Sequence, residues 1–254
     1  AIDGHLYANE NSSFMFYQMT AVDQVNGLDK LDVSRVTDMS QMFWSLGQDS
    51  QAFTLTIPNN WDLTSVTNMD RMFYWTGAND PAFTLNLGSN FDTSNVTSME
   101  MMFDNCGSNS TVMTLNLGSK FYTNKVTNMM QMFAMTGQSS PVFTLTLGNN
   151  FDTSNVTTMS SMFLYTGYDS TVFTINLGSK FYTSKVTDMY QMFAGIGGSS
   201  SSFSINLGSH FDTSNVTNME GMFKFTGDGN PNFTLNLGSN FDTSKVTNMR
   251  EMFK

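Results

Sequence analysis

The chain repeats a Met-Phe pair every 30 residues, and this period constrains the fold more than any other feature. The phenylalanines of the pairs are Phe43, Phe73, Phe103, Phe133, Phe163, Phe193, Phe223 and Phe253. A period of roughly 20–50 residues is typical of proteins in which each copy is one supersecondary unit stacked on its neighbours. Because no insertion or deletion interrupts the repeats, we predict a single elongated solenoid.

The two ends of the chain depart from the regular repeat. Phe16 precedes Phe43 by 27 residues instead of 30, so we predict an atypical N-terminal capping unit at residues 1–30 and regular repeats at residues 31–254. The sequence stops at Lys254, within a repeat, and we therefore expect a solenoid that is truncated at its C-terminal end.

Residues 83–112 illustrate the strand of one repeat. Residues 83–87 alternate apolar and polar side chains, which is the period of a half-buried β-strand. Residues 88–90 read Gly-Ser-Asn, which is typical of a turn. Stacked repeats therefore predict short parallel strands, one in each coil.

The second half of the repeat predicts a short helix. Thr97 is placed as its N-cap, Glu100 completes a capping box, and Gly107 lies where a left-handed residue ends a helix. The apolar side chains between them follow the spacing i, i+3 and i+4 and are Met99, Met102 and Phe103. The predicted coil is thus one strand, one turn, one capped helix and a loop of variable sequence.

Composition excludes several classes of function. The net charge of −10 disfavours nucleic acid as a partner, because phosphate binding needs a basic surface. A lone Cys106 excludes an intramolecular disulfide framework, and no apolar run reaches the roughly 18 residues of a membrane span. The 22 methionines recur beside the repeated phenylalanines, so we interpret them as core residues and predict neither a metal site nor a cofactor.

Two polar columns are expected on the outer face of the strands. One is mostly threonine and the other mixes asparagine with threonine, as in Thr84 with Asn86 and Thr144 with Thr146. A flat threonine-rich array suits ice or a regular glycan. We favour the simpler interpretation that threonine is a good solvent-side strand residue and that stacked asparagines bond one another.

A third column alternates aspartate with tyrosine and runs Asp32, Asp62, Asp92, Tyr122, Asp152, Tyr182, Asp212 and Asp242. Stacked carboxylates suggest calcium. Lysines such as Lys120 and Lys125 appear where tyrosine interrupts the column, and we expect them to supply opposite charge between neighbouring coils. We therefore interpret the column as stacking electrostatics.

The positions just after each Met-Phe pair differ from copy to copy. Binding in repeat scaffolds usually involves such variable positions, since the constant ones maintain the fold. Exposed aromatic side chains suit stacking on sugars or contact with a protein partner, although packing along the coil edge explains them equally well. The candidate ligand-binding residues are Trp44, Tyr74, Trp75, Tyr165, Tyr168 and Phe225.

Catalytic chemistry has little support in the sequence. His5 and His210 are the only histidines, and neither belongs to a recognisable motif. Cys106 takes a position that is threonine in four other repeats, which favours a small packed residue over a nucleophile. We predict that the chain is not an enzyme.

Residues 211–223, Phe-Asp-Thr-Ser-Asn-Val-Thr-Asn-Met-Glu-Gly-Met-Phe, resemble the BspA-like leucine-rich repeats of bacterial surface proteins, also described as surface repeats of about 26 residues. The resemblance covers about residues 12–254 and implies a leucine-rich-repeat-like solenoid. It departs from the family in its longer period. It also departs at the family's cysteine position, which only Cys106 matches, while Thr76, Thr136, Thr166 and Thr226 stand in its place in four other repeats.

The resemblance implies a secreted or cell-wall-attached bacterial protein. We expect a non-enzymatic adhesion module that binds a host protein or a glycan, or that associates with itself. The alternatives are a structural stalk or fibre that spaces another domain from the wall, and the substrate-binding arm of a catalytic domain beyond Lys254. Exposed aromatic residues along one edge favour adhesion, whereas a uniform Ser/Thr/Asn surface favours the stalk.

Overall fold

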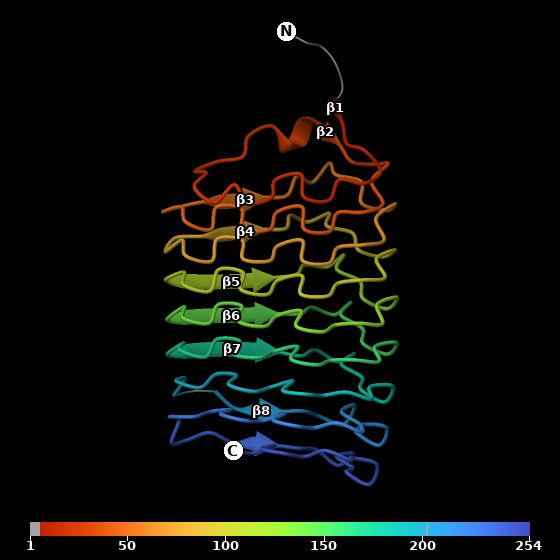
Figure 1. The fold of residues 1–254 in the computed structure, drawn as a ribbon, viewed down its shortest axis with the longest axis vertical. Helices are drawn as coiled ribbons and strands as arrows, with labels where there is room; N and C mark the ends of the chain where they lie inside the picture. The colour runs from red at the N-terminus through yellow and green to blue at the C-terminus, as the bar shows by residue number, and fades with distance from the viewer. Residues whose placement is uncertain (1–5, 202) are drawn as a thin grey trace.

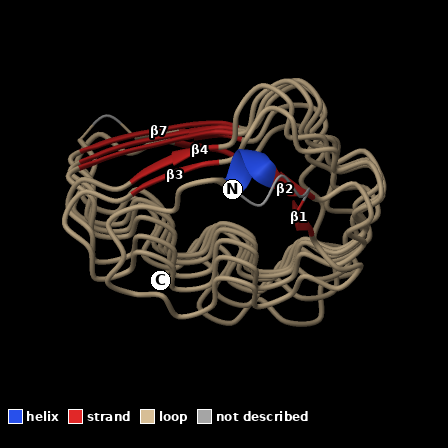
Figure 2. Cartoon of the chain, turned by 90° about the horizontal axis from the view of Figure 1, so that it is seen from above, coloured by secondary structure: helices blue, strands red, loops and turns tan. Residues whose placement is uncertain are grey.

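The computed structural model describes residues 6–201 and 203–254 and shows a β-solenoid whose coils stack along the longest axis of the molecule (Figure 1). Strands of neighbouring coils are parallel. Seen from above, β3, β4 and β7 lie together on one side of the coil, and turns and loops form the rest of its outline (Figure 2). The repeat solenoid with one short parallel strand per coil is confirmed.

The elements are short. In chain order they are β1 (Leu6–Tyr7), the 3-10 helix η1 (Leu28–Lys30), β2 (Leu31–Asp32), β3 (Thr54–Thr56), β4 (Thr84–Asn86), β5 (Val112–Asn116), β6 (Val142–Thr146), β7 (Val172–Asn176), β8 (Ile205–Asn206) and β9 (Leu235–Asn236).

The strand register follows the sequence period. Leu55 pairs with Leu85, and Leu115 pairs with Leu145, so equivalent residues of adjacent repeats lie side by side. The ladders join β1 to β2, β3 to β4, β5 to β6 to β7, and β8 to β9. A second parallel ladder of single bridges runs the length of the chain, from Asn11 through Asp38 to Asn248, again in steps of one repeat after the first.

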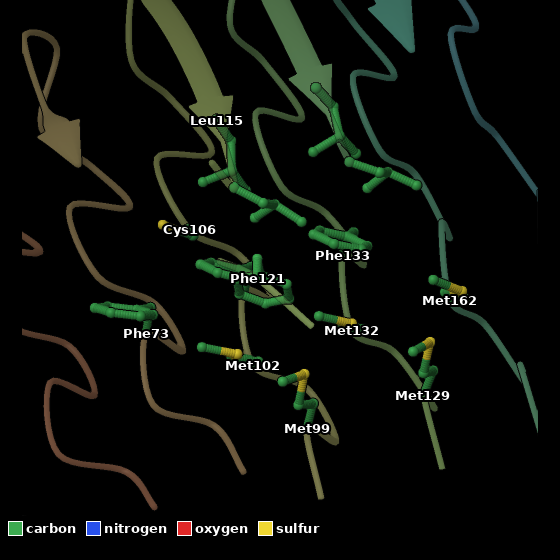
Figure 3. Close-up of a cluster of buried hydrophobic side chains, with 14 of the residues drawn as sticks. Phe73, Met99, Met102, Cys106, Leu115, Phe121, Met129, Met132, Phe133 and Met162 are labelled. Carbon is green, nitrogen blue, oxygen red and sulfur yellow. The ribbon is translucent and has the colours of Figure 1, made fainter. Parts of the chain in front are cut away.

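The core is built from columns of identical side chains. The predicted phenylalanine column is buried from Phe43 to Phe223, and Phe253 at its end is exposed. Successive rings stack nearly parallel, with 5.6 Å between the centroids of Phe103 and Phe133 and an interplanar angle of 2°. The methionines lie beside this column, as Figure 3 shows for Met99, Met102 and Met132. These methionines and the phenylalanines belong to one buried cluster, so the interpretation of the repeated methionines as core residues is confirmed.

The predicted helix in each coil is wrong. Its segment is a path of tight turns, in which alternate N–H groups bond within the coil and between coils. The N–H of Met132 donates to the carbonyl of Met129 three residues back, at 3.3 Å between nitrogen and oxygen. The next N–H, that of Phe133, donates instead to the carbonyl of Met162 in the following coil, at 2.9 Å.

Two features explain why the turn path replaces a helix. An isolated helix of so few residues is unstable, because forming its first turn costs more than its few internal bonds return. Stacked coils offer each second N–H a carbonyl in the neighbouring coil. The turns require left-handed residues, and Gln131 and Met135 have φ values of 53° and 52°.

The predicted capping box is wrong for the same reason. The hydroxyl of Thr97 donates to the carbonyl of Thr67 in the preceding coil at 3.2 Å, and Glu100 forms an ion pair with Arg71 at 2.6 Å. Glycine at Gly107 is indeed left-handed, with φ of 57°, but it closes a turn instead of a helix. At the equivalent Gly77 an added Cβ would lie 2.2 Å from the ring of Phe83, so this column excludes larger residues.

The first unit continues the solenoid with a shorter spacing. Phe16 stacks on Phe43 with 5.4 Å between ring centroids, so it begins the aromatic column. β1 pairs with β2 in parallel, and Leu6 and Tyr7 are exposed. Residues 1–5, and with them His5, lie outside the described part, and the boundary at residue 30 stays a prediction.

Candidate functional site

The six candidate aromatic residues all follow the phenylalanine column in the turn path. Because the repeat places equivalent positions above one another, Trp44 and Tyr74 occupy one column of this edge, and Trp75, Tyr165 and Phe225 occupy the next. The six side chains are all half-buried. The aromatic residues thus lie along one edge of the solenoid, divided into separate groups.

The largest group, which we call the N-terminal aromatic cluster, comprises Phe14, Tyr17, Trp44, Tyr74 and Trp75. Neighbouring rings meet edge to face, with 5.1 Å between the centroids of Tyr17 and Trp44 and 5.0 Å between those of Trp44 and Tyr74. Phe14 is 46% exposed, and the other rings are half-buried. The cluster therefore forms a continuous, partly exposed aromatic surface across three coils.

Phe14 and Tyr17 belong to this cluster although we did not predict them as site residues. Their rings lie 5.3 Å apart between centroids and continue the row from Trp44. The sequence signal was the 27-residue offset of Phe16 from Phe43, which places Tyr17 above Trp44 in the same column.

Tyr165 and Tyr168 form a second group with a different environment. Their ring centroids are 5.1 Å apart. An added Cβ on Gly195 or Gly198 of the next coil would lie 2.3 Å or 2.6 Å from the rings of Tyr165 and Tyr168, so each ring covers a glycine. These two tyrosines serve coil packing as well as the surface.

Phe225 stands apart from both groups, and the ammonium of Lys224 lies 5.0 Å from its ring centroid. Asp104, Asn105 and Ala134 take the edge positions between the first and second groups, and all three are buried. The six candidate residues therefore do not form one continuous surface.

Asp104 is a buried carboxylate that sequence reasoning missed. It occupies the column of Trp44 and Tyr74, and its side chain accepts a bond from the Asn105 amide at 2.8 Å. Burial raises the pKa of Asp104 from 3.8 to about 7, against the lowering effects of the Asn105 bond and of the Arg71 charge. A single aspartate among variable, mostly apolar positions was the signal in the sequence.

Comparison with known protein families supplies the assignment. The family described as "Mycoplasma protein of unknown function, DUF285" matches residues 10–140, 108–234 and 168–254. The chain belongs to this family. A search of curated proteins finds no match, and a search of solved structures finds none either.

The outward polar columns of this DUF285 chain follow the strands as expected. Thr114, Thr144 and Thr174 lie in register on β5, β6 and β7 and are half-buried or exposed. The side-chain oxygens of Asn116 and Asn176 accept the N–H of the glycine two residues later, at 3.0 and 2.9 Å. The asparagines of this column therefore stabilise the turn after the strand.

The aspartate column has a local structural role. The carboxylate of Asp92 accepts the N–H of Ser94 at 2.9 Å, and Asp152 and Asp212 repeat this bond to the residues two positions later. At Asp62 the bonds from Thr64 lower the carboxyl pKa, while the nearby charge of Asp32 acts to raise it. Each carboxylate thus stabilises a turn of its own coil.

The lysines beside this column bind asparagine, not aspartate. Lys125 donates to the side-chain oxygen of Asn95 one coil earlier at 2.6 Å, and Lys185 makes the same bond to Asn155. The expected pairing of opposite charges between coils is replaced here by bonds between ammonium and amide. The asparagines in turn donate to carbonyls of the coil before them, as Asn155 does to Asn124 at 2.7 Å.

Cys106, His210 and the acidic side chains are the remaining candidates for catalysis or metal binding. Cys106 is buried, and burial raises the pKa of its thiol, so the thiolate nucleophile is disfavoured. Threonines at its position donate to a carbonyl, as Thr136 does to Phe103 at 2.7 Å. The ring of His210 lies 4.8 Å from that of Tyr182. No cluster of three His, Cys, Asp or Glu side chains suited to a metal occurs in residues 6–201 and 203–254.

The described part of the chain contains no helix of the length and hydrophobicity that crossing a membrane requires. Within the same residues, every fully buried side-chain nitrogen or oxygen has a hydrogen-bond partner.

Proposed function

We propose that the chain is a non-enzymatic binding and adhesion module on the surface of a bacterium. The observation that carries this proposal is the N-terminal aromatic cluster, a partly exposed row of rings that crosses three coils. Rings already packed edge to face lose little conformational freedom on binding, and aromatic side chains dominate the energetics of many interfaces. The cluster therefore suits a host protein or a glycan as its partner.

The difference between constant and variable positions supports this use of the edge. The phenylalanine and methionine columns recur in every copy and are buried up to Phe223, whereas the edge positions change from Trp44 to Asp104 to Ala134. A repeat scaffold can vary an edge of this kind without disturbing the stacked core.

The family and the sequence motif support the proposed setting. The matched family is a Mycoplasma family, and the motif at residues 211–223 resembles BspA-like repeats of bacterial surface proteins. On that resemblance we propose a leucine-rich-repeat-like ancestry and a secreted or wall-attached location. The chain's solenoid has turn paths where the sequence predicted a helix.

The test is binding of a double variant. The protein is incubated with an array of neutral and charged glycans and of host extracellular proteins, and Tyr74→Ala with Trp75→Ala is compared with the unsubstituted chain. We expect binding to fall about thirtyfold, the effect of losing about 2 kcal/mol at an aromatic hot spot. Thermal melting of each protein shows whether the fold is kept.

Tyr190→Ala is the matched control, because Tyr190 is also half-buried but lies outside the aromatic edge. It should bind as the unsubstituted chain does. If the double variant binds normally while folded, the adhesion proposal fails and the stalk becomes the better explanation.

A structural stalk or self-associating fibre is the second candidate. Tyr165 and Tyr168 favour it, since their rings cover Gly195 and Gly198 and so hold neighbouring coils together. Ladders of backbone bonds join coils along the chain, as expected of a spacer. Light scattering at increasing concentration distinguishes a self-associating fibre from a monomeric module.

A further inference from the structure

The parallel sheet is interrupted between β7 and β8. β5, β6 and β7 form one ladder and β8 and β9 another, and no ladder joins them in the described residues. β4 and β5 are also not joined by a ladder, but there Leu85 and Leu87 stay buried. In Figure 1 the arrows of β7 and β8 stand further apart than those of β5, β6 and β7.

The other side of the same coils remains closed. The N–H of Met189 donates to the carbonyl of Asn218 at 3.0 Å, and the rings of Phe193 and Phe223 stack at 5.7 Å between centroids. The two coils therefore stay in contact along the turn path and are separated only at their strands.

The opening exposes core positions and contains a cavity of about 450 Å³, within the range of ligand sites. Ile175 and Leu177 are half-buried here, whereas the equivalent Leu145 and Leu147 are fully buried. The cavity reaches Phe193 and Ile196 in the interior. The pocket therefore has apolar side chains in its interior and polar ones, such as Thr174 and Asn206, at its rim, and it opens at the strand edge.

The strand edge at this pocket has free hydrogen-bonding groups. In the closed ladder after it, Ile205 donates its N–H to the carbonyl of Thr234 at 3.0 Å, and Leu207 donates to Asn236 at 3.2 Å. Among the described residues, neither Ile175 nor Leu177 makes such a bond to the next coil. Leu147 in the joined ladder makes none either, so the unpaired N–H that distinguishes this edge is that of Ile175. An unpaired parallel edge binds another strand through the same groups.

We propose that the opening between β7 and β8 binds an extended peptide segment of a partner protein. The peptide continues the parallel ladder of β5, β6 and β7 by pairing with the edge of β7, and its inward aliphatic side chains enter the pocket. The residues that line the pocket include no Asp or Glu, and His210 is the ionisable one among them. An uncharged peptide with alternating apolar residues, like the strands of this chain, therefore fits.

The probe for the test is a fluorescein-labelled peptide with the sequence of residues 232–237, Asn-Phe-Thr-Leu-Asn-Leu. We expect a saturable rise in fluorescence anisotropy at concentrations below about 1 mM. A peptide in which both leucines are aspartate should not bind. Hydrogen exchange should be fast at the amides of Ile175 and Leu177 without peptide and slower with it.

Two variants locate the binding. Ile175→Trp fills the pocket and should weaken binding by at least about tenfold, while Val172→Trp, at an exposed position at the start of the same strand, should not. If Ile175→Trp does not fold, hydrogen exchange at the Leu177 amide still tests the proposal, because it is measured on the unsubstituted chain with and without peptide.

Three results would overturn the proposal. These are an absence of saturable binding, amides of Ile175 and Leu177 that are already protected without peptide, and an equal loss of binding in both variants. The second would mean that β7 and β8 pair with each other in solution. None of these results bears on the aromatic edge, so this inference and the proposed adhesion function fail separately.

Discussion

Phe133 lies between Phe103 and Phe163, with 5.6 Å between its ring centroid and that of each neighbour. Phe133→Ala removes a fully buried ring from this column, and we expect it to lower the free energy of unfolding by about 3–5 kcal/mol. Urea unfolding followed by circular dichroism measures the loss. A cost below about 1 kcal/mol would contradict the assigned packing, since large core truncations rarely cost so little.

Asp104 predicts a pH dependence of stability. Its pKa is raised from 3.8 to about 7 in the folded chain, so between these values the folded state binds more protons than the unfolded state. The contribution of Asp104 to the free energy of unfolding should therefore be most favourable below about pH 4 and should fall as the pH rises to about 7. Asp104→Asn should remove this slope and stabilise the protein above pH 7 by up to about 4 kcal/mol.

Thermal melting from pH 4 to pH 8 measures this effect. Asp49→Asn is the control, because Asp49 is exposed whereas Asp104 is buried. A pH slope that is the same in Asp104→Asn and in the unsubstituted chain would show that Asp104 is not the group responsible.

The turn path decides how this element responds to substitution. Gln131 has a left-handed backbone with φ of 53°, and the equivalent Gly221 shows that glycine is compatible with the position. A left-handed conformation costs a residue with a Cβ about 1–2 kcal/mol in the folded state, and glycine avoids this cost. Part of the gain is lost, because glycine also makes the unfolded chain more flexible and so stabilises the unfolded state. We therefore expect Gln131→Gly to stabilise the protein by about 0.5 kcal/mol.

The same substitution tests the predicted helix. Inside a helix, glycine costs about 1 kcal/mol relative to ordinary residues. Chemical denaturation of Gln131→Gly beside Gln131→Ala gives the sign. A destabilised glycine variant would favour the helix and contradict the turn path.

The strand and the predicted helix differ in what their sequences specify. Residues 83–87 alternate strictly, and only a strand places Phe83, Leu85 and Leu87 on one face. The spacing of Met99, Met102 and Phe103 satisfies a helix, but a path of tight turns, each closed by a bond between residues three positions apart, also buries all three. The strand could therefore be predicted and the turn path could not.

For the whole molecule we expect no dependence on calcium. The carboxylate column is interrupted at Tyr122 and Tyr182, and Asp92 and Asp152 accept N–H groups of their own coils. A specific ion at 100 times its dissociation constant would add about 2.7 kcal/mol to stability. Melting with calcium and with EDTA should give the same midpoint, and a drop of several degrees in EDTA would contradict this prediction.

The candidate site was predictable only in part. The variable positions after each Met-Phe pair placed Trp44, Tyr74 and Trp75 in adjacent columns, because equivalent residues stack. Their edge-to-face contacts, the burial of Asp104 and the covering of Gly195 by Tyr165 depend on how neighbouring coils pack, which the repeat alone does not specify.

The sequence by itself determined the solenoid, its 30-residue register and the buried phenylalanine and methionine columns, because an uninterrupted period forces identical positions to stack. Tertiary structure decided whether each N–H bonds within its coil or to the next one, and so turned an expected helix into a turn path. It also opened the sheet between β7 and β8. Both outcomes depend on hydrogen bonds between residues about 30 positions apart in the chain. The strength of such a bond depends on where the neighbouring coil places its carbonyl group, which the local sequence does not specify.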